Sequence, residues 1–160
     1  MARLKDLDQA SQTFLLNMDC PVFETRPWVN GPPLNQRRVA IVTTAGLHRR
    51  SDKAFLVATV PEQTKPVDYR VIPADTRASD LVMSHTSTNF DRIGFQQDSN
   101  LVFPIDRLME LKSAGVIGSV GDFHYSFMGA VDSRLMQPAA TRLANLLKRD
   151  RVDAILLIPV

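Results

Sequence analysis

The three histidines of the chain are the side chains best suited to proton chemistry near neutral pH, because imidazole titrates there. His48 lies in TTAGLHRR, His85 in SHTSTNFDR and His124 in DFHYSFMG. His48 and His85 each follow a predicted strand, and parallel strands bring their following loops to one edge of a sheet. If those strands are parallel, both histidines lie at one polar edge. The alternative is that each histidine only hydrogen-bonds its own loop.

Residues 84–89, SHTSTN, form the densest cluster of hydroxyl and amide groups in the chain. Such groups can orient a carboxylate or carbonyl substrate by hydrogen bonds. The alternative is a turn in which the hydroxyls satisfy their own backbone. Both interpretations stay open from the sequence.

Several common chemistries lack their sequence signatures. The histidines show no HxH or HxxxH spacing, so no metal site is expected. No G-x-S-x-G elbow surrounds Ser84 or Ser87, which weighs against a serine hydrolase. No G-x-G-x-x-G follows a strand, so nicotinamide binding is disfavoured.

The elements that must position these residues follow from hydrophobic periodicity. Strands are predicted at 39–43, 69–72 and in a short run ending near Ser84. A helix is predicted from Pro104, with Gly115 past its end. A second helix is predicted over 137–150, and its core-facing stripe consists of Ala140, Leu143, Leu146 and Leu147.

The second helix leads directly into an apolar strand at 154–158, which predicts a crossover unit. A run that is apolar on both faces suits an interior parallel strand, whose end would point at the loops of His85 and His124. The expected fold class is therefore α/β, with a Rossmann-like, largely parallel sheet and flanking helices.

Composition indicates one ordinary globular domain. The chain has 160 residues and a net charge of +2. This charge is too small to favour binding to nucleic acid or to an anionic membrane. We expect an N-terminal segment over 1–36, with a Pro-rich arm at 21–36 anchored by Phe23 and Trp28, and a single α/β domain over 37–160. The single cysteine, Cys20, and the lack of a leader or long apolar run indicate a cytoplasmic protein.

Several strings of the sequence together resemble a known family. They are VAIVTTAGLHRR, DYRVIPADT, DLVMSHTSTNFDR, GFQQD, NLVFPIDRLMELKSAGVIGSV, DFHYSFMGA and DAILLIPV. In this order, from about Arg37 to Val160, the chain resembles the selenoprotein B subunit family of glycine, sarcosine, betaine and D-proline reductases.

The resemblance implies a reductase subunit that cleaves a carbon–nitrogen bond of a small amine or amino acid. In that family a selenocysteine or cysteine follows the strand similar to AILLIPV, and a cysteine lies three positions on. A partner subunit carries a pyruvoyl group, and thiols re-reduce the selenium. The resemblance thus implies that the domain is incomplete at its C-terminal end. It also implies that this chain lacks the nucleophile and is inactive alone. A homo- or hetero-oligomer is expected.

The resemblance places no catalytic residue on this chain, so the candidates are residues that form a pocket. We expect His85, Thr86, Ser87 and Asn89 to orient the substrate or partner, with His124 and Tyr125 as a second wall and His48 as a further candidate. No cofactor is expected on this chain. The alternative function is a non-catalytic ligand-binding or protein-interaction module.

Overall fold

A computed structural model describes residues 3–17, 22–55, 67–86, 90 and 92–160. The strands are β1 Arg38–Thr43, β2 Leu47–Arg49, β3 Arg70–Pro73, β4 Leu81–Met83, β5 Ser119–Val120, β6 Phe123–Ser126 and β7 Ala154–Ile158. The α-helices are α1 Gln9–Leu16, α2 Ile93–Gln97, α3 Ile105–Ser113 and α4 Gln137–Arg149. Short 3₁₀ turns are η1 Leu4–Asp6, η2 Leu34–Gln36, η4 Ala78–Asp80, η5 Ser99–Leu101 and η6 Ser133–Met136. Within these ranges no helix is long and apolar enough to cross a bilayer.

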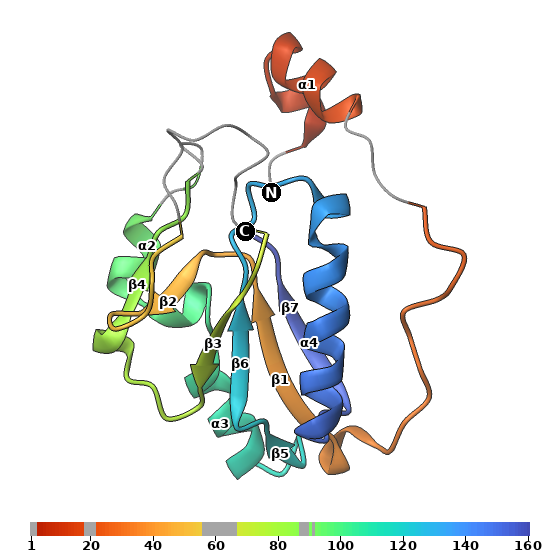
Figure 1. Ribbon diagram of the computed structural model, residues 1–160, viewed down its shortest axis with the longest axis vertical. Coiled ribbons are helices and arrows are strands. Elements are labelled where there is room, and N and C mark those ends of the chain that lie inside the picture. The colour runs from red at the N-terminus through yellow and green to blue at the C-terminus, as the bar shows by residue number, and fades with distance from the viewer. Residues whose placement is uncertain (1–2, 18–21, 56–66, 87–89, 91) are drawn as a thin grey trace.

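The main sheet has five strands and is built around β1 (Figure 1). The strand β7 pairs with β1 in parallel from Val39↔Ala154 to Thr43↔Ile158. Because β7 takes up one side of β1, β5 and β6 share the other side, both parallel to it. The strand β3 completes the sheet, antiparallel to β6. The expected mixed α/β fold with a mostly parallel sheet is confirmed, while a Rossmann-like arrangement stays a prediction.

The strand ending near Ser84 does not join this sheet. It is β4, which pairs antiparallel with β2 in a separate two-stranded ribbon. His48 and His85 were expected at one edge only if their preceding strands were parallel. These strands are not parallel neighbours in one sheet, so that expectation does not apply. The ribbon forms because the chain turns away after β1 at Gly46, whose φ of 67° few other residues adopt.

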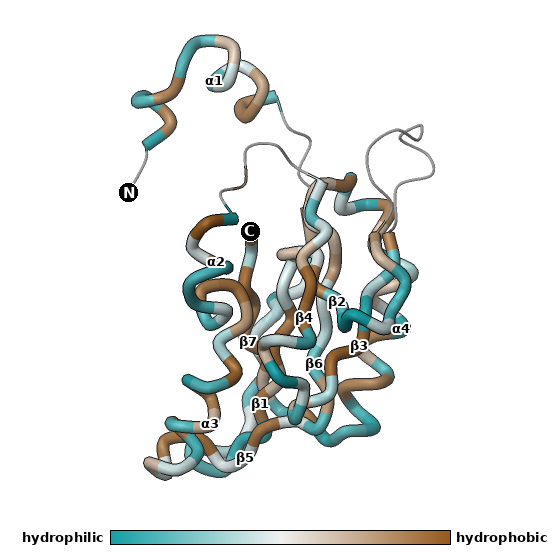
Figure 2. The backbone as a smooth tube through the Cα atoms, turned by 90° about the vertical axis from the view of Figure 1, so that its left-hand side faces the viewer, coloured by the Kyte–Doolittle hydropathy of each residue, from teal (hydrophilic) through white to brown (hydrophobic). Residues whose placement is uncertain are grey.

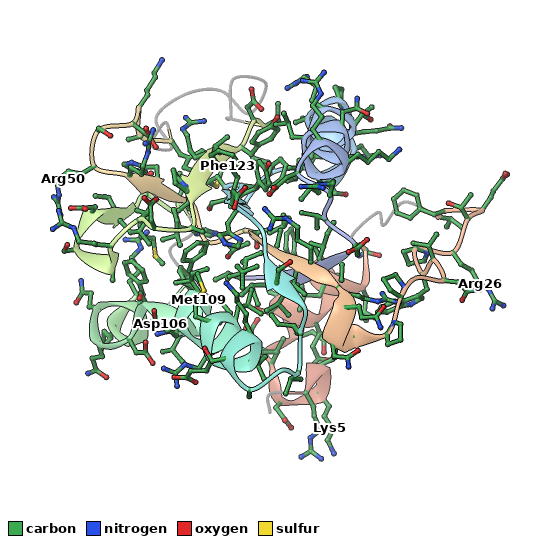
Figure 3. The ribbon with its side chains drawn as sticks, turned by 90° about the horizontal axis from the view of Figure 1, so that it is seen from below. Lys5, Arg26, Arg50, Asp106, Met109 and Phe123 are labelled. Carbon is green, nitrogen blue, oxygen red and sulfur yellow. The ribbon has the colours of Figure 1, made fainter. Side chains whose placement is uncertain are left out.

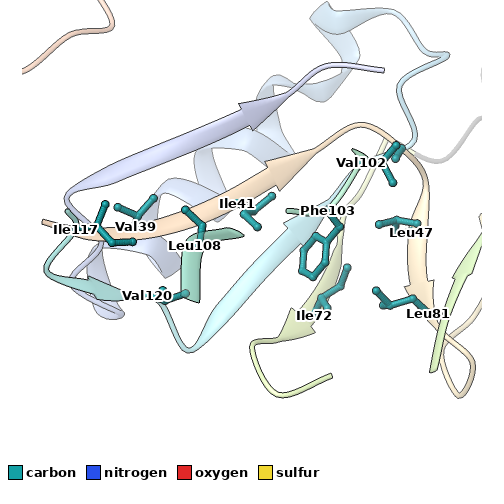
Figure 4. Close-up of a cluster of buried hydrophobic side chains, with 11 residues drawn as sticks. Val39, Ile41, Leu47, Ile72, Leu81, Val102, Phe103, Leu108, Ile117 and Val120 are labelled. Carbon is teal, nitrogen blue, oxygen red and sulfur yellow. The ribbon is translucent and has the colours of Figure 1, made fainter. Parts of the chain in front are cut away.

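Alternation along β1 separates two hydrophobic cores. Val39 and Ile41 face the side covered by α3 and the ribbon, where a cluster of eleven buried residues includes Phe103 and Leu108 (Figure 4). Ala40 faces the opposite side, where α4 packs on Tyr125 and Phe127. The sheet is thus covered on both faces, as its apolar strands require.

The two predicted helices are confirmed, with one correction to the face that α4 buries. Helix α3 begins after Pro104 and ends before Gly115, whose φ is 69°. In α4 the buried residues are Ala139, Leu143 and Leu147, and Ala140 is exposed. The spacing of four residues between these positions fits one helical face better than the predicted stripe, which spread onto the solvent side.

The predicted anchoring of the N-terminal arm by two aromatic side chains is wrong. Phe23 and Trp28, predicted to anchor the arm, are 75% and 89% exposed. Helix α1 stands apart from the sheet in Figure 2, and Lys5 and Arg26 lie away from it in Figure 3. The apolar side chains of the arm therefore make no buried contact within the described residues. The division at residue 36 stays a prediction.

The predicted interior position of the last strand is wrong. Among the described strands, β7 pairs with β1 alone, so it lies at the edge of the sheet. Ala154, Leu156 and Ile158 pack on the α3-side core, whereas Ile155 and Leu157 are exposed on the other face. The parallel direction was predicted correctly, because the preceding helix makes a crossover connection.

One ion-pair network joins the starts of the parallel strands. The Arg38 guanidinium at the start of β1 donates to a carboxylate oxygen of Asp150 at 2.6 Å and to the carbonyl of Val120 at 2.9 Å. It also lies 2.9 Å from a carboxylate oxygen of Asp122. The Asp153 carboxylate accepts from the Arg38 amide at 3.0 Å. These contacts tie β1 to β5 on one side and to the end of α4 on the other.

We predict that Arg38→Met lowers the free energy of unfolding by about 3 kcal/mol, because the Asp150 carboxylate would stay largely buried without its cation. The matched control is Arg77→Met, whose partner Asp80 is half exposed, and it should cost under about 1 kcal/mol. Urea unfolding at neutral pH measures both values. Equal losses in the two variants would contradict a structural role for the Arg38 network.

Candidate functional site

The carboxyl ends of β1, β6 and β7 meet at one end of the sheet, near the C-terminus in Figure 1. The residues that approach one another there are Thr44, Gly46, His85, Thr86, Met128, Gly129 and Val160. We call these residues the carboxyl edge. It is the end of a mostly parallel sheet at which ligands usually bind.

Val160 is fixed at this edge by Thr44. The Val160 amide donates to Thr44 Oγ1 at 2.8 Å, and that hydroxyl donates to the Val160 carbonyl at 3.3 Å. The Thr44 amide also donates to the Ile158 carbonyl at 3.1 Å. A Cβ on Gly129 would lie 2.9 Å from the Cβ of Thr44, so glycine is needed for this approach. One threonine therefore positions the end of β7 against the loop after β6.

His85 reaches the same edge through a close backbone contact with Gly46. The Ser84 amide donates to the Gly46 carbonyl at 3.0 Å. A Cβ on Gly46 would lie 3.0 Å from both Cα and the amide nitrogen of His85. Gly46 is two residues from Thr44, a span of at most about 7.6 Å. The end of β7 thus lies near the loop of His85. The prediction that it also points at the loop of His124 is wrong, because His124 lies within β6, and the role of this end in binding stays a prediction.

His85 and Thr86 are held from several directions. The His85 ring packs against Phe90 at 5.0 Å between centroids, and Arg92 donates to the His85 carbonyl. Burial lowers the pKa of His85, and the nearby Arg92 charge lowers it further. Thr86 Oγ1 donates to the Met128 sulfur at 3.1 Å. A neutral imidazole and a hydroxyl at this edge suit hydrogen bonding to a polar ligand.

His124 lies inside the sheet and not at the carboxyl edge. Its Nδ1 accepts from the Ile41 amide at 2.9 Å, which places the proton on Nε2. This bond fills the gap between β5 and β6, where β1 has no backbone partner for that amide. Burial lowers the pKa of His124 to about 4, so the ring is neutral at pH 7. Its ring meets Phe103 edge to face.

Tyr125 and His48 also lie away from the carboxyl edge. Tyr125 follows His124 in β6 and therefore faces the α4 side, where it packs against Tyr69. Burial raises the pKa of Tyr125. His48 is buried in the ribbon, where Nδ1 donates to the Arg49 carbonyl at 2.8 Å and the ring meets Phe55. The structure thus does not unite His48, His124 and Tyr125, and their role in binding stays a prediction.

Two further predicted site residues, Ser87 and Asn89, lie outside the described residues. Within the described part of the chain, no group of three His, Cys, Asp or Glu side chains is arranged to hold a metal ion. The edge supplies hydroxyl, imidazole and backbone groups. The sole cysteine of the sequence, Cys20, lies outside the described residues, and the described residues of the edge include no thiol.

Two cavities lie at the opposite end of the sheet. One of about 330 Å³ is lined by Arg49, Arg50, Asp75 and Asp80 among others, and one of about 260 Å³ adjoins the start of α3. Both include residues that follow Pro73, which pairs with Phe123 at the start of β6. These cavities are therefore separate from the carboxyl edge.

Four residues of the carboxyl edge were missed in the sequence: Thr44, Gly46, Met128 and Gly129. Gly46 and Gly129 each follow a strand within a few residues, and a glycine there indicates a close backbone approach. Thr44 carries no such signal, because its role depends on a residue 116 positions away.

In the unfolded state His124 becomes protonated as the pH falls below its ordinary pKa of about 6.5. In the folded state its pKa is about 4, so protonation requires a lower pH. Stability should therefore fall as the pH drops from 6.5 to 4, by about 3 kcal/mol for this group. His124→Asn retains an acceptor for the Ile41 amide but does not titrate, so its unfolding free energy should fall less over this range. Urea unfolding at pH 7, 5.5 and 4.5 measures the difference. Identical pH slopes would contradict the buried neutral histidine.

We predict that Gly46→Ala destabilises the fold by about 2–4 kcal/mol, since it combines an unfavourable φ with a backbone clash at His85. Gly115→Ala is the matched control, because Gly115 has φ 69° and a Cβ added there would meet nothing within 4 Å. It should cost about 1 kcal/mol. Thermal and urea unfolding of the two variants separate the two contributions. If Gly46→Ala lowers the unfolding free energy no more than Gly115→Ala does, the close contact with the His85 backbone does not contribute to the destabilisation.

Comparisons with known proteins agree with the resemblance. Residues 9–159 match the model of the family "Glycine/sarcosine/betaine reductase selenoprotein B". A curated relative, the D-proline reductase subunit gamma of Acetoanaerobium sticklandii, is 32% identical over 126 residues. That match covers 78% of this chain but 49% of the relative, so the chain spans about half the length of the curated relative it matches. No solved structure matches. Because the family model covers nearly the whole sequence, the chain belongs to the glycine/sarcosine/betaine reductase selenoprotein B family.

Proposed function

We propose that this chain forms the part of a selenocysteine-dependent reductase subunit that positions the nucleophile for reductive carbon–nitrogen cleavage. The observation that carries the proposal is the hydrogen bonding of Val160 to Thr44 beside the loop of His85 and Thr86. In the family that this chain resembles, the selenocysteine or cysteine follows the residue that corresponds to Val160. The carboxyl edge would then hold the reacting atom next to polar side chains.

The chalcogen anion would attack the substrate carbon that bears nitrogen, so that a carbon–chalcogen bond forms as the carbon–nitrogen bond breaks and the nitrogen keeps the electron pair. Thiols would then break the carbon–chalcogen bond, a proton would replace the chalcogen on carbon, and the two electrons supplied would leave the thiols as a disulfide. The groups of this chain have positioning roles. Thr44 fixes the backbone just before the nucleophile, and Gly129 allows the loop after β6 to approach it. His85 and Thr86, together with Ser87 and Asn89, would orient the substrate or the partner. The buried His85 has a lowered pKa and is neutral at pH 7, so it binds without adding a charge.

We further propose that the partner is a pyruvoyl-containing subunit and that the substrate is a small amino acid or amine of the glycine, sarcosine, betaine or D-proline type. The relative from Acetoanaerobium sticklandii, by its name, belongs to a D-proline reductase. The family model names glycine, sarcosine and betaine. The shared feature of these substrates is a carboxylate next to the carbon that bears nitrogen, which suits the hydroxyl and amide groups of residues 84–89.

The nucleotide sequence beyond codon 160 is the first test. An in-frame UGA, a selenocysteine insertion element and a cysteine codon three positions on would support the proposal. An ordinary stop codon with no continuation would contradict it and favour a non-catalytic ligand-binding or interaction module.

We predict that the 160-residue chain, mixed with a pyruvoyl-containing partner and a dithiol, does not turn over glycine, sarcosine, betaine or D-proline. The reason is that the proposed nucleophile follows the place of Val160, and the sole thiol of the given sequence, Cys20, has no second cysteine or predicted helix N-terminus near it in the sequence to activate it. A chain extended through the selenocysteine and the following cysteine should cleave the carbon–nitrogen bond of one of these substrates. In the extended chain Thr44→Val should lower kcat by about tenfold or more, because the last residue of the edge loses its hydrogen bonds.

The control for that assay is Thr141→Val, a threonine on the exposed side of α4, which should leave kcat unchanged. Turnover by the 160-residue chain that disappears in Cys20→Ser would overturn the proposed nucleophile. Full activity of Thr44→Val in the extended chain would overturn the positioning role of Thr44.

A further inference from the structure

The hydroxyl of Thr86 at the carboxyl edge has its proton engaged by the sulfur of Met128. Thr86 Oγ1 lies 3.1 Å from Met128 Sδ. A thioether sulfur carries no hydrogen and can only accept, so Thr86 must be the donor in this contact. The Ala130 amide donates to the same sulfur at 3.3 Å. Met128 therefore accepts hydrogen bonds from two segments of the edge at once.

This contact leaves Thr86 with lone pairs and no free proton. A hydroxyl has one proton and two lone pairs, and the proton of Thr86 points at Met128. Met128 is 1% exposed, so its sulfur is shielded from water that would compete for the contact. Thr86 itself is half-buried, so its side chain is not closed off. Toward a ligand, Thr86 can therefore only accept a hydrogen bond.

Thr44, the other described hydroxyl of the carboxyl edge, also has its proton engaged. It donates to the Val160 carbonyl at 3.3 Å and accepts from the Val160 amide at 2.8 Å. Both hydroxyls therefore use their protons within the chain. A ligand group that forms a hydrogen bond with either of them must bring its own hydrogen.

We infer that Thr86 accepts a hydrogen bond from the amino group of the substrate and thereby selects substrates that carry at least one N–H. Glycine, sarcosine and D-proline meet this condition. Betaine does not, because its nitrogen carries three methyl groups and no hydrogen. Met128 is a positioning residue, since its sulfur fixes the direction of the Thr86 proton. The inference rests on the proposed function, which places the substrate at this edge.

The surroundings of Thr86 suit an amino acid bound in this direction. Arg92 donates to the carbonyl of His85, the carbon of which is bonded to the Thr86 nitrogen. The Arg92 charge is close enough to lower the pKa of the His85 ring. A substrate carboxylate would be attracted to this guanidinium, while the ammonium group would meet the neutral acceptor of Thr86. The two ends of the substrate would thus be distinguished by charge.

A quaternary ammonium group needs a different kind of site. Proteins recognise such groups with the faces of aromatic rings. The described residues of the carboxyl edge include no Phe, Tyr or Trp. Phe90 contacts the His85 ring but packs against the α3-side core. Betaine would therefore gain neither a hydrogen bond to Thr86 nor an aromatic cage from these residues.

Binding of a methylated series tests the inference without turnover. Sarcosine, N,N-dimethylglycine and betaine share a carboxylate, and at neutral pH betaine alone lacks an N–H. NMR titration of the 160-residue chain, labelled with ¹³C at the methionine methyl groups, follows the Met128 signal. Sarcosine and dimethylglycine should bind at least about tenfold more tightly than betaine, because one hydrogen bond to a charged group is lost. Equal binding of dimethylglycine and betaine, or no binding of dimethylglycine, would overturn the inference.

Variants assign this preference to individual residues. Thr86→Val keeps the size of the side chain but removes the acceptor, so the preference over betaine should disappear, whereas Thr86→Ser should retain it. Met128→Leu should reduce the preference, because the Thr86 proton can then rotate toward the ligand. Thr141→Val, on the exposed side of α4, is the control and should bind as the unmodified chain does. Circular dichroism checks that each variant is folded.

An unchanged preference in Thr86→Val would refute the role of Thr86, and one in Met128→Leu would refute the positioning role of Met128. Turnover by the extended chain separates these results from the proposed function. If that chain cleaves betaine as efficiently as sarcosine, the reductase function holds and the selectivity inference fails. If the binding preference is present but no substrate is cleaved, the amino-group site at Thr86 holds and the reductase function fails.

Discussion

The arrangement of the whole sheet depends on Arg38 and its contacts with Asp150 and Val120. These groups lie where β1, β5 and the turn before β7 begin. Parallel strands have no tight turn to fix their relative position, so register must come from contacts between segments distant in sequence. The guanidinium has five donors in a fixed plane and can bind several carbonyl and carboxylate oxygens at once. Fixing the starts of the strands also fixes where their carboxyl ends meet.

At those carboxyl ends, small polar side chains satisfy the backbone where the strands separate. Ser126 Oγ accepts from the Leu47 amide at 2.8 Å, and Thr43 Oγ1 accepts from the Ala45 amide at 3.2 Å. Both side chains are fully buried. A buried amide without an acceptor would cost about 1–3 kcal/mol. Their placement lets the chain leave β1 for the ribbon and still keep the edge rigid enough to position Val160 and His85.

The sequence contained the local elements but not their order in space. Helix α3 was predictable because Pro104 and Gly115 mark its ends, and β1 because its β-branched run is bounded by polar residues. The antiparallel direction of β3 and the separation of β4 into a ribbon depend on long-range pairing, which periodicity does not encode. For the same reason the apolar run of β7 fits both an interior strand and an edge strand with exposed apolar side chains, and only the pairing with β1 distinguishes them.

The histidines show where a closer use of strand geometry would have improved the predicted site. His124 and Tyr125 are consecutive in a strand, and consecutive side chains point to opposite faces, so they could never form one wall of one pocket. His124 instead satisfies the Ile41 amide at the gap between β5 and β6, a role with no sequence signature because it needs the strand break. His85 differs because it follows its strand. A histidine after a strand end can reach the carboxyl edge, whereas a histidine within a strand covered on both faces becomes part of the core.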